Sequence, residues 1–145
     1  MLPALLQVAR NGSRTVAEHP AIPRTPGELA RESRAAVQAG ARILHLHAYD
    51  AGSETLAAEP CAAALRAVRA SCLGVPVSLT TSVEIEPDPR RRLRLELVAG
   101  WSELPELVTA NQGEASIFEL CEHLLGRGVG IEAGLLSVAD AEASC

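Results

Sequence analysis

Short apolar runs alternate with longer amphipathic runs along the whole chain, and this alternation constrains the fold more than any other feature. The short runs are rich in Leu, Ile and Val, as strands are, while the longer runs repeat their apolar residues with the spacing of a helix face. The expected strands are Ala4–Ala9, Arg42–His47, Val75–Thr80, Glu106–Ala110 and Val129–Ala133. Strands separated by helices predict βαβ units and a parallel sheet, so we expect an α/β fold in a single domain over residues 1–145.

The helices are marked by their ends and by their apolar stripes. Thr25, Pro26 and Glu28 match a capping box with proline in the first turn, and Gly40 is a typical helix end. Further helices are expected at Thr55–Ala70, after Asp88-Pro89, through Ile117–Leu125 and from about Ser137. In the helix after Pro89 we expect Leu93 and Leu97 to face the core, and four arginines to form a solvated face: Arg90, Arg91, Arg92 and Arg94.

Five such strands fit two architectures. One is an open, doubly wound sheet, which would be complete as it stands; the other is a (β/α)8 barrel, which typically needs about 250 residues. The periodicity by itself favours the open sheet, because that fold requires no further strands.

The composition excludes several classes of function. The apolar content of 48% is enough for one core, but single Trp, Tyr and Phe residues and a net charge of −5 argue against a nucleic-acid binder. No apolar run reaches the length of a membrane span, which takes about 20 residues. The four cysteines show no CxxC spacing and no signal peptide is recognisable, so we expect a reduced, cytoplasmic protein.

The sharpest local signal is the pair His45 and His47, at the end of the second expected strand. Residues i and i+2 of a strand point to the same face, so both imidazoles would project together at the carboxyl end of the sheet. Two imidazoles suit a divalent metal such as zinc, which in catalytic sites takes three protein ligands and leaves one position open. The alternative is a strand-end cap and a hydrogen-bonded core histidine. Asp50 either orients one of these histidines or, more commonly for such a residue, caps the next segment.

Other polar residues are expected at the same end of the sheet. Glu132 ends the fifth strand and suits substrate binding, proton transfer or an ion pair, or else is a rim residue facing water. Thr80 offers a hydroxyl that can hold a carboxylate or carbonyl oxygen, or else belongs to a cluster that simply forms a turn. Arg14 follows the first strand, where it can clamp an anion. Asn111 and Glu114 follow the fourth strand and line the same face or, more commonly for loop residues, act as helix caps.

Several segments together resemble the β-keto acid cleavage enzymes. They are Asn11-Gly12, His19 to Pro23, Thr25-Pro26, Glu28 to Ala30, Ala39 to Ala41, Ile43 to His47, Trp101-Ser102, Leu104-Pro105 and Gly128 to Leu135. The resemblance covers essentially the whole chain but only the first half or so of the family's length. It implies a (β/α)8 barrel of which about five βα units are present here.

The resemblance also implies a reaction and a site. Members of the family exchange a β-keto acid with acetyl-CoA, giving acetoacetate and a new acyl-CoA, and they use zinc. By this resemblance His45 and His47 bind the zinc, Glu132 is the active-site glutamate, and Thr80 and Asn111 contact substrate or acetyl-CoA. Arg14 stands where the enzyme for amino-substituted substrates has an acidic residue, so a neutral or acidic β-keto acid is expected. A homo-oligomer is expected as well.

The family's third zinc ligand and its Arg-Asp pair would lie beyond Cys145. We therefore interpret the chain as a truncated part of a family enzyme, and the sequence leaves open whether it is active alone. The alternative from another class is a non-catalytic partial-barrel remnant that acts as a metal-binding or assembly module. A complete doubly wound domain that binds an unrelated small molecule is a third reading, which the lack of a phosphate-binding loop disfavours.

Overall fold

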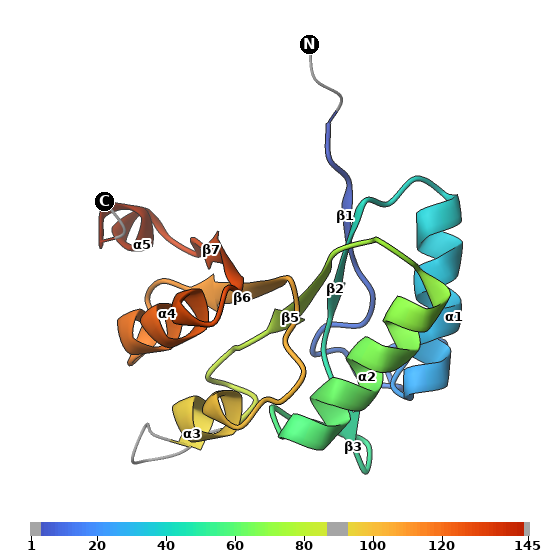
Figure 1. The fold of residues 1–145 in the computed structure, drawn as a ribbon, viewed down its shortest axis with the longest axis horizontal. Coiled ribbons are helices and arrows are strands. Elements are labelled where there is room, and N and C mark those ends of the chain that lie inside the picture. Colours follow the sequence, from blue (N-terminus) through green and yellow to red (C-terminus); the bar gives the residue numbers. More distant parts are fainter. Residues whose placement is uncertain (1–3, 87–92, 144–145) are drawn as a thin grey trace.

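The computed structural model describes residues 4–86 and 93–143, and its centre is a parallel sheet of five strands (Figure 1). The strands are β1 (Gln7–Ala9), β2 (Ile43–Leu46), β5 (Val77–Thr80), β6 (Leu107–Asn111) and β7 (Gly130–Gly134). All five expected strands are present, each within a few residues of its expected bounds. A short antiparallel hairpin, β3 (Tyr49–Asp50) and β4 (Ser53–Glu54), was not expected; its turn places Ala51 and Gly52 at positive φ.

The helices are α1 (Pro26–Gln38), α2 (Ala58–Ser71), α3 (Leu93–Ala99), α4 (Ile117–Gly126) and α5 (Val138–Ala143). The capping box that the sequence predicts at the start of α1 is confirmed: the Thr25 hydroxyl accepts a hydrogen bond from the Glu28 backbone N–H, and the Glu28 carboxylate accepts one from the Thr25 N–H. Each bond satisfies a backbone donor that a helix start leaves without a partner.

The strands stand in the sheet in chain order, β1-β2-β5-β6-β7, and every pairing is parallel. A doubly wound fold reverses its strand order at a switch point, whereas an unreversed order with right-handed crossovers keeps the helices on one side. Figure 1 shows α1, α2, α3 and α4 along one side of the curved row of strands. The doubly wound alternative is therefore wrong. The described strands form an open sheet, with β1 and β7 at its edges.

The two faces of the sheet differ in chemistry. The face toward the helices carries fully buried aliphatic side chains: Leu44, Leu46, Val77, Leu79, Val108 and Ala110. The other face carries a row of polar side chains, with His45, Thr109 and Glu132 half-buried and Ser78 fully buried. Because alternate residues of a strand point to opposite faces, the burial of the aliphatic face fixes the register of the polar one. The core thus positions a row of polar groups across four strands.

The expected orientation of α3 is partly wrong. Arg94 is not solvated but only 4% exposed, and Leu93 faces solvent at 37% exposure. The Arg94 guanidinium donates hydrogen bonds to the backbone oxygens of Thr81 and Ala115 and pairs with the Glu114 carboxylate. Three acceptors in one place satisfy a buried guanidinium, which explains why the helix turns this arginine inward. The other three arginines of the expected solvated face lie outside the described residues.

Candidate active site

The two histidines lie together where β2 ends. Their ring centres are 5.2 Å apart and the ring planes are nearly perpendicular, at 81°. The backbone that carries His47 is held by the buried Asn11: its side-chain oxygen accepts a hydrogen bond from the His47 N–H at 3.0 Å, and its side-chain nitrogen donates to the His47 carbonyl at 2.8 Å. Asn11 therefore fixes the end of β2 against the loop after β1, and with it the position of the second imidazole.

Glu132 is linked to His45 through a serine. The Ser78 hydroxyl lies 2.5 Å from Glu132 Oε2 and 3.2 Å from His45 Nδ1. A carboxylate only accepts hydrogen bonds, so the serine proton goes to Glu132 and the serine oxygen is left to accept from His45. Thr109, from the strand between them, adds a hydroxyl 3.3 Å from His45 Nδ1. This arrangement places the proton of a neutral His45 on Nδ1 and leaves Nε2 with its lone pair.

Both imidazoles are neutral at pH 7. The pKa of His45 is lowered to about 4, chiefly by burial and in smaller part by the neighbouring His47, while Glu132 opposes the shift. Burial also lowers the pKa of His47, against the opposing effect of the Glu54 carboxylate. Desolvation disfavours the charged form of a histidine, so these directions follow from the position of the pair at the edge of the core. Neutral imidazole is the form that binds metals.

The remaining predicted residues lie around this pair but do not all converge on it. Thr80 is buried and its hydroxyl accepts a hydrogen bond from the Ser82 N–H at 3.3 Å. Arg14 is exposed and borders a pocket of about 390 Å³, which it shares with Tyr49 and Glu54. The structure thus brings His45, His47 and Glu132 into one cluster and places Arg14 on the Glu54 side of it.

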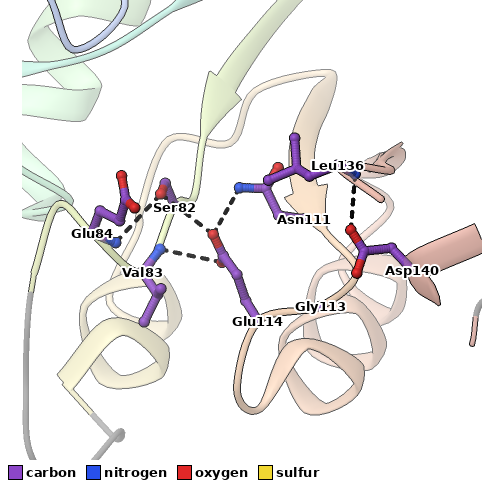
Figure 2. Close-up of a pocket in the computed structure, with 8 residues that line it drawn as sticks. All are labelled: Ser82, Val83, Glu84, Asn111, Gly113, Glu114, Leu136 and Asp140. Atoms are coloured by element: carbon purple, nitrogen blue, oxygen red, sulfur yellow. Dashed lines mark hydrogen bonds between the residues drawn. The ribbon is translucent and has the colours of Figure 1, made fainter. Parts of the chain in front are cut away.

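Asn111 lines a separate pocket of about 300 Å³ (Figure 2), formed by Ser82, Val83, Glu84, Asn111, Gly113, Glu114, Leu136 and Asp140. The Asn111 side-chain nitrogen donates to Glu114 at 2.7 Å, and Glu114 also accepts from the Ser82 hydroxyl and the Val83 N–H. Neither residue acts as a helix cap: the residue before α4 is Ser116, without a side-chain cap. Glu114 instead ties the loop after β5 to the loop after β6, with Arg94 behind it.

Three residues of the cluster were missed by the sequence analysis. Ser78 and Thr109 occupy the same strand face as the histidines, and a search for polar residues at alternate strand positions would have found them. Glu54 could not be found that way, because it reaches His47 only through the hairpin. Asp50, considered as the residue that orients a histidine, is exposed and pairs with Ser53 across the hairpin.

The histidine pair fits part of a zinc site. Two imidazoles that bind one tetrahedral zinc, with each nitrogen about 2.0 Å from the metal, have ring centres about 5 Å apart, which matches the observed separation. Both rings are neutral, and His45 keeps Nε2 for a metal. The described part of the chain contains no cluster of three His, Cys, Asp or Glu side chains able to hold a metal ion. The pair therefore supplies two ligands, and a third has to come from elsewhere.

Comparison with known proteins identifies the family of the chain. The model of the beta-keto acid cleavage enzyme family matches residues 3–135. The chain belongs to this family. This confirms the resemblance inferred from the sequence segments.

One relative and one solved structure show how much of a longer protein the chain matches. The 3-keto-5-aminohexanoate cleavage enzyme of Fusobacterium nucleatum subsp. nucleatum is 34% identical over 92 residues, which are 62% of this chain and 34% of that enzyme. The apo structure of ObcA is similar with a TM-score of 0.65 and 19% identity, over 86% of this chain and 32% of that one. The second likeness shows the fold alone. In both cases the matched segment spans about a third of the relative's length.

A search of the described residues for a helix long and apolar enough to cross a membrane found none. The free cysteines among them are Cys61, Cys72 and Cys121.

Proposed function

We propose that this chain carries the first part of a zinc-dependent β-keto acid cleavage enzyme, folded as about five βα units of a (β/α)8 barrel. The reaction exchanges acyl groups: a β-keto acid and acetyl-CoA give acetoacetate and a new acyl-CoA. The observation that carries the proposal is the cluster of two neutral histidines and Glu132 on one sheet face, in a chain that belongs to this family. We further propose that the enzyme is a homo-oligomer and that it acts in the cytoplasm.

In this proposal His45 and His47 hold the zinc through their ring nitrogens. Bound zinc would supply a Lewis acid for the 3-oxo oxygen of the substrate, stabilising negative charge on that oxygen. A histidine must be neutral before it binds a metal, so the burial that lowers both histidine pKa values prepares the pair for the metal at pH 7.

Glu132 acts on protons in this proposal. Its Oε2 accepts the Ser78 hydroxyl proton, which orients the carboxylate and leaves Oε1 to accept a proton from the substrate. Thr80 and Asn111, at the carboxyl ends of β5 and β6, bind the substrate or acetyl-CoA by hydrogen bonds. Active sites of parallel α/β folds lie at these strand ends, which supports the placement.

Arg14 restricts the substrate class. Its guanidinium is 73% exposed at the pocket that also contains Glu54, so a substrate that extends there meets a positive charge. A substrate with an ammonium group would be repelled, and a neutral or acidic β-keto acid is favoured.

The experiment incubates the purified protein, in a form that spans the family's full length and is supplied with zinc, with a panel of β-keto acids and acetyl-CoA and detects new acyl-CoA by mass spectrometry. We expect turnover with at least one neutral or acidic substrate, its loss in His45→Ala, and its retention in His19→Ala, which changes an exposed histidine outside the cluster. Equal turnover in His45→Ala would refute the site. Zinc binding without turnover on any substrate would favour the alternative function, a non-catalytic metal-binding or assembly module.

A further inference from the structure

The Glu54 carboxylate is buried against the second histidine. Its side chain is 15% exposed, that of His47 is 11% exposed, and Glu54 Oε2 lies 3.4 Å from His47 Nδ1. Glu54 reaches this position because the β3–β4 hairpin turns back at Gly52 and places β4 against β3, directly after the histidine strand. The sequence separates the two residues by a turn, and the fold brings them into contact.

The electrostatics of this contact decide where the proton of a neutral His47 lies. Nδ1 is buried and has no hydrogen bond of good geometry to any described residue, so Glu54 is the polar group it faces. An unprotonated Nδ1 would place its lone pair beside a carboxylate oxygen 3.4 Å away, and the two would repel each other. A protonated Nδ1 faces the same oxygen with a positive edge, which is the arrangement of metal-binding histidines whose other nitrogen points to a carboxylate. Nε2 is then the nitrogen with the free lone pair.

The carboxylate itself is held in place. The Ser13 hydroxyl donates to Glu54 Oε2 at 3.3 Å, and the Tyr49 hydroxyl lies 3.2 Å from Oε1. Tyr49 is fixed in turn by the Arg24 guanidinium, 5.0 Å above the centre of its ring. Contacts from the loop after β1 and from the neighbouring strand thus limit the freedom of the Glu54 side chain.

We propose that Glu54 is a positioning residue for His47: it holds the ring proton on Nδ1 and so presents Nε2 to a divalent cation, zinc in the first instance. This inference rests on the proposed function, in which His47 is a metal ligand. It also distinguishes the two histidines by the groups that orient their rings. His45 is oriented by a neutral serine hydroxyl, whereas His47 is oriented by a full negative charge, which strengthens the ring as a ligand.

The first test is zinc affinity, measured by competition with a chromophoric chelator on the purified protein. Glu54→Gln keeps the size of the side chain and removes its charge, and we expect it to weaken zinc binding about 10–100-fold. The control is Asp50→Asn, which removes an exposed carboxylate from the same hairpin, and we expect no change. An equal affinity in wild type and Glu54→Gln would overturn the proposal, as would an equal loss in the Asp50→Asn control.

The decisive measurement of the second test is made on the metal-free wild-type protein, so it depends neither on zinc binding nor on whether a variant folds. Long-range 1H–15N spectra of the metal-free wild-type protein distinguish a histidine protonated at Nδ1 from one protonated at Nε2. We expect His47 to carry its proton on Nδ1, and this preference to weaken in Glu54→Gln, because an amide can donate as well as accept. A proton on Nε2 in the wild type would overturn the proposal even if zinc binds. Failure of the wild type to bind zinc would refute the metal in the proposed function, while the tautomer would still decide whether Glu54 orients the ring.

Discussion

Arg94 provides the strongest test of how the site loops are held, because its burial reverses the expectation from sequence. Arg94→Met keeps the aliphatic stem and removes the charge, so the Glu114 carboxylate, 12% exposed, loses its ion pair with Arg94. Leaving one partner of a buried pair without its counter-charge costs about 3–5 kcal/mol. Glu114 retains three donors, from Ser82, Val83 and Asn111, but the Arg94 hydrogen bonds to the backbone oxygens of Thr81 and Ala115 are lost as well, so we expect a loss within this range, at least about 3 kcal/mol.

The assay is urea unfolding followed by the fluorescence of Trp101, a fully buried side chain near the end of α3 and the single tryptophan of the chain. The control is Arg31→Met on the exposed face of α1, which should change the free energy of unfolding by less than about 0.5 kcal/mol. In the double variant Arg94→Met with Glu114→Gln, no buried charge is left unpaired, so we expect about 1 kcal/mol or more to be recovered relative to additivity. A loss below about 1 kcal/mol for Arg94→Met would refute the reasoning.

Two further predictions concern the cluster and the pocket beside it. In metal-free protein the His45 pKa lies near 4, below its ordinary 6.5, so the unfolded chain binds more protons between these values and stability should fall as the pH drops from about 6.5 to 4. Urea unfolding at several pH values should show that the free energy of unfolding of the wild type falls by roughly 3 kcal/mol over this range. The fall should be smaller in His45→Gln, and an equal fall in both proteins would contradict the burial of the ring. Gly134→Ala would place a methyl group against the Asn111 side-chain oxygen and should destabilise the protein, whereas Gly27→Ala, with open space around it, should not. Equal unfolding midpoints for both alanine variants would contradict that close contact.

The sequence predicted those parts of the fold that depend on local patterns. The strands, the capping box at Thr25 and the shared face of His45 and His47 all follow from spacing and end residues, which act over a few positions. The contacts that complete the site depend on tertiary structure. Glu54 reaches His47 only through the turn of a hairpin, and Arg94 is buried because acceptors from two distant loops meet at its guanidinium. No pattern within one element contains that information.

The periodicity of the sequence led to a wrong expectation for the sheet. Periodicity favoured an open doubly wound sheet, but it cannot report the order of strands within a sheet. The order β1-β2-β5-β6-β7 depends on which faces the helices cover, and this is decided by packing between segments that lie far apart in the chain.

The central claim is that His45 and His47 together bind zinc, and X-ray absorption at the zinc edge tests it most directly. With one equivalent of zinc, we expect a first shell of nitrogen and oxygen at about 2.0 Å, with the outer-shell scattering of two imidazoles that is lost in part from His47→Ala. A sulfur shell at about 2.3 Å, or an unchanged spectrum in His47→Ala, would place the metal on other residues and refute the assignment of the two histidines.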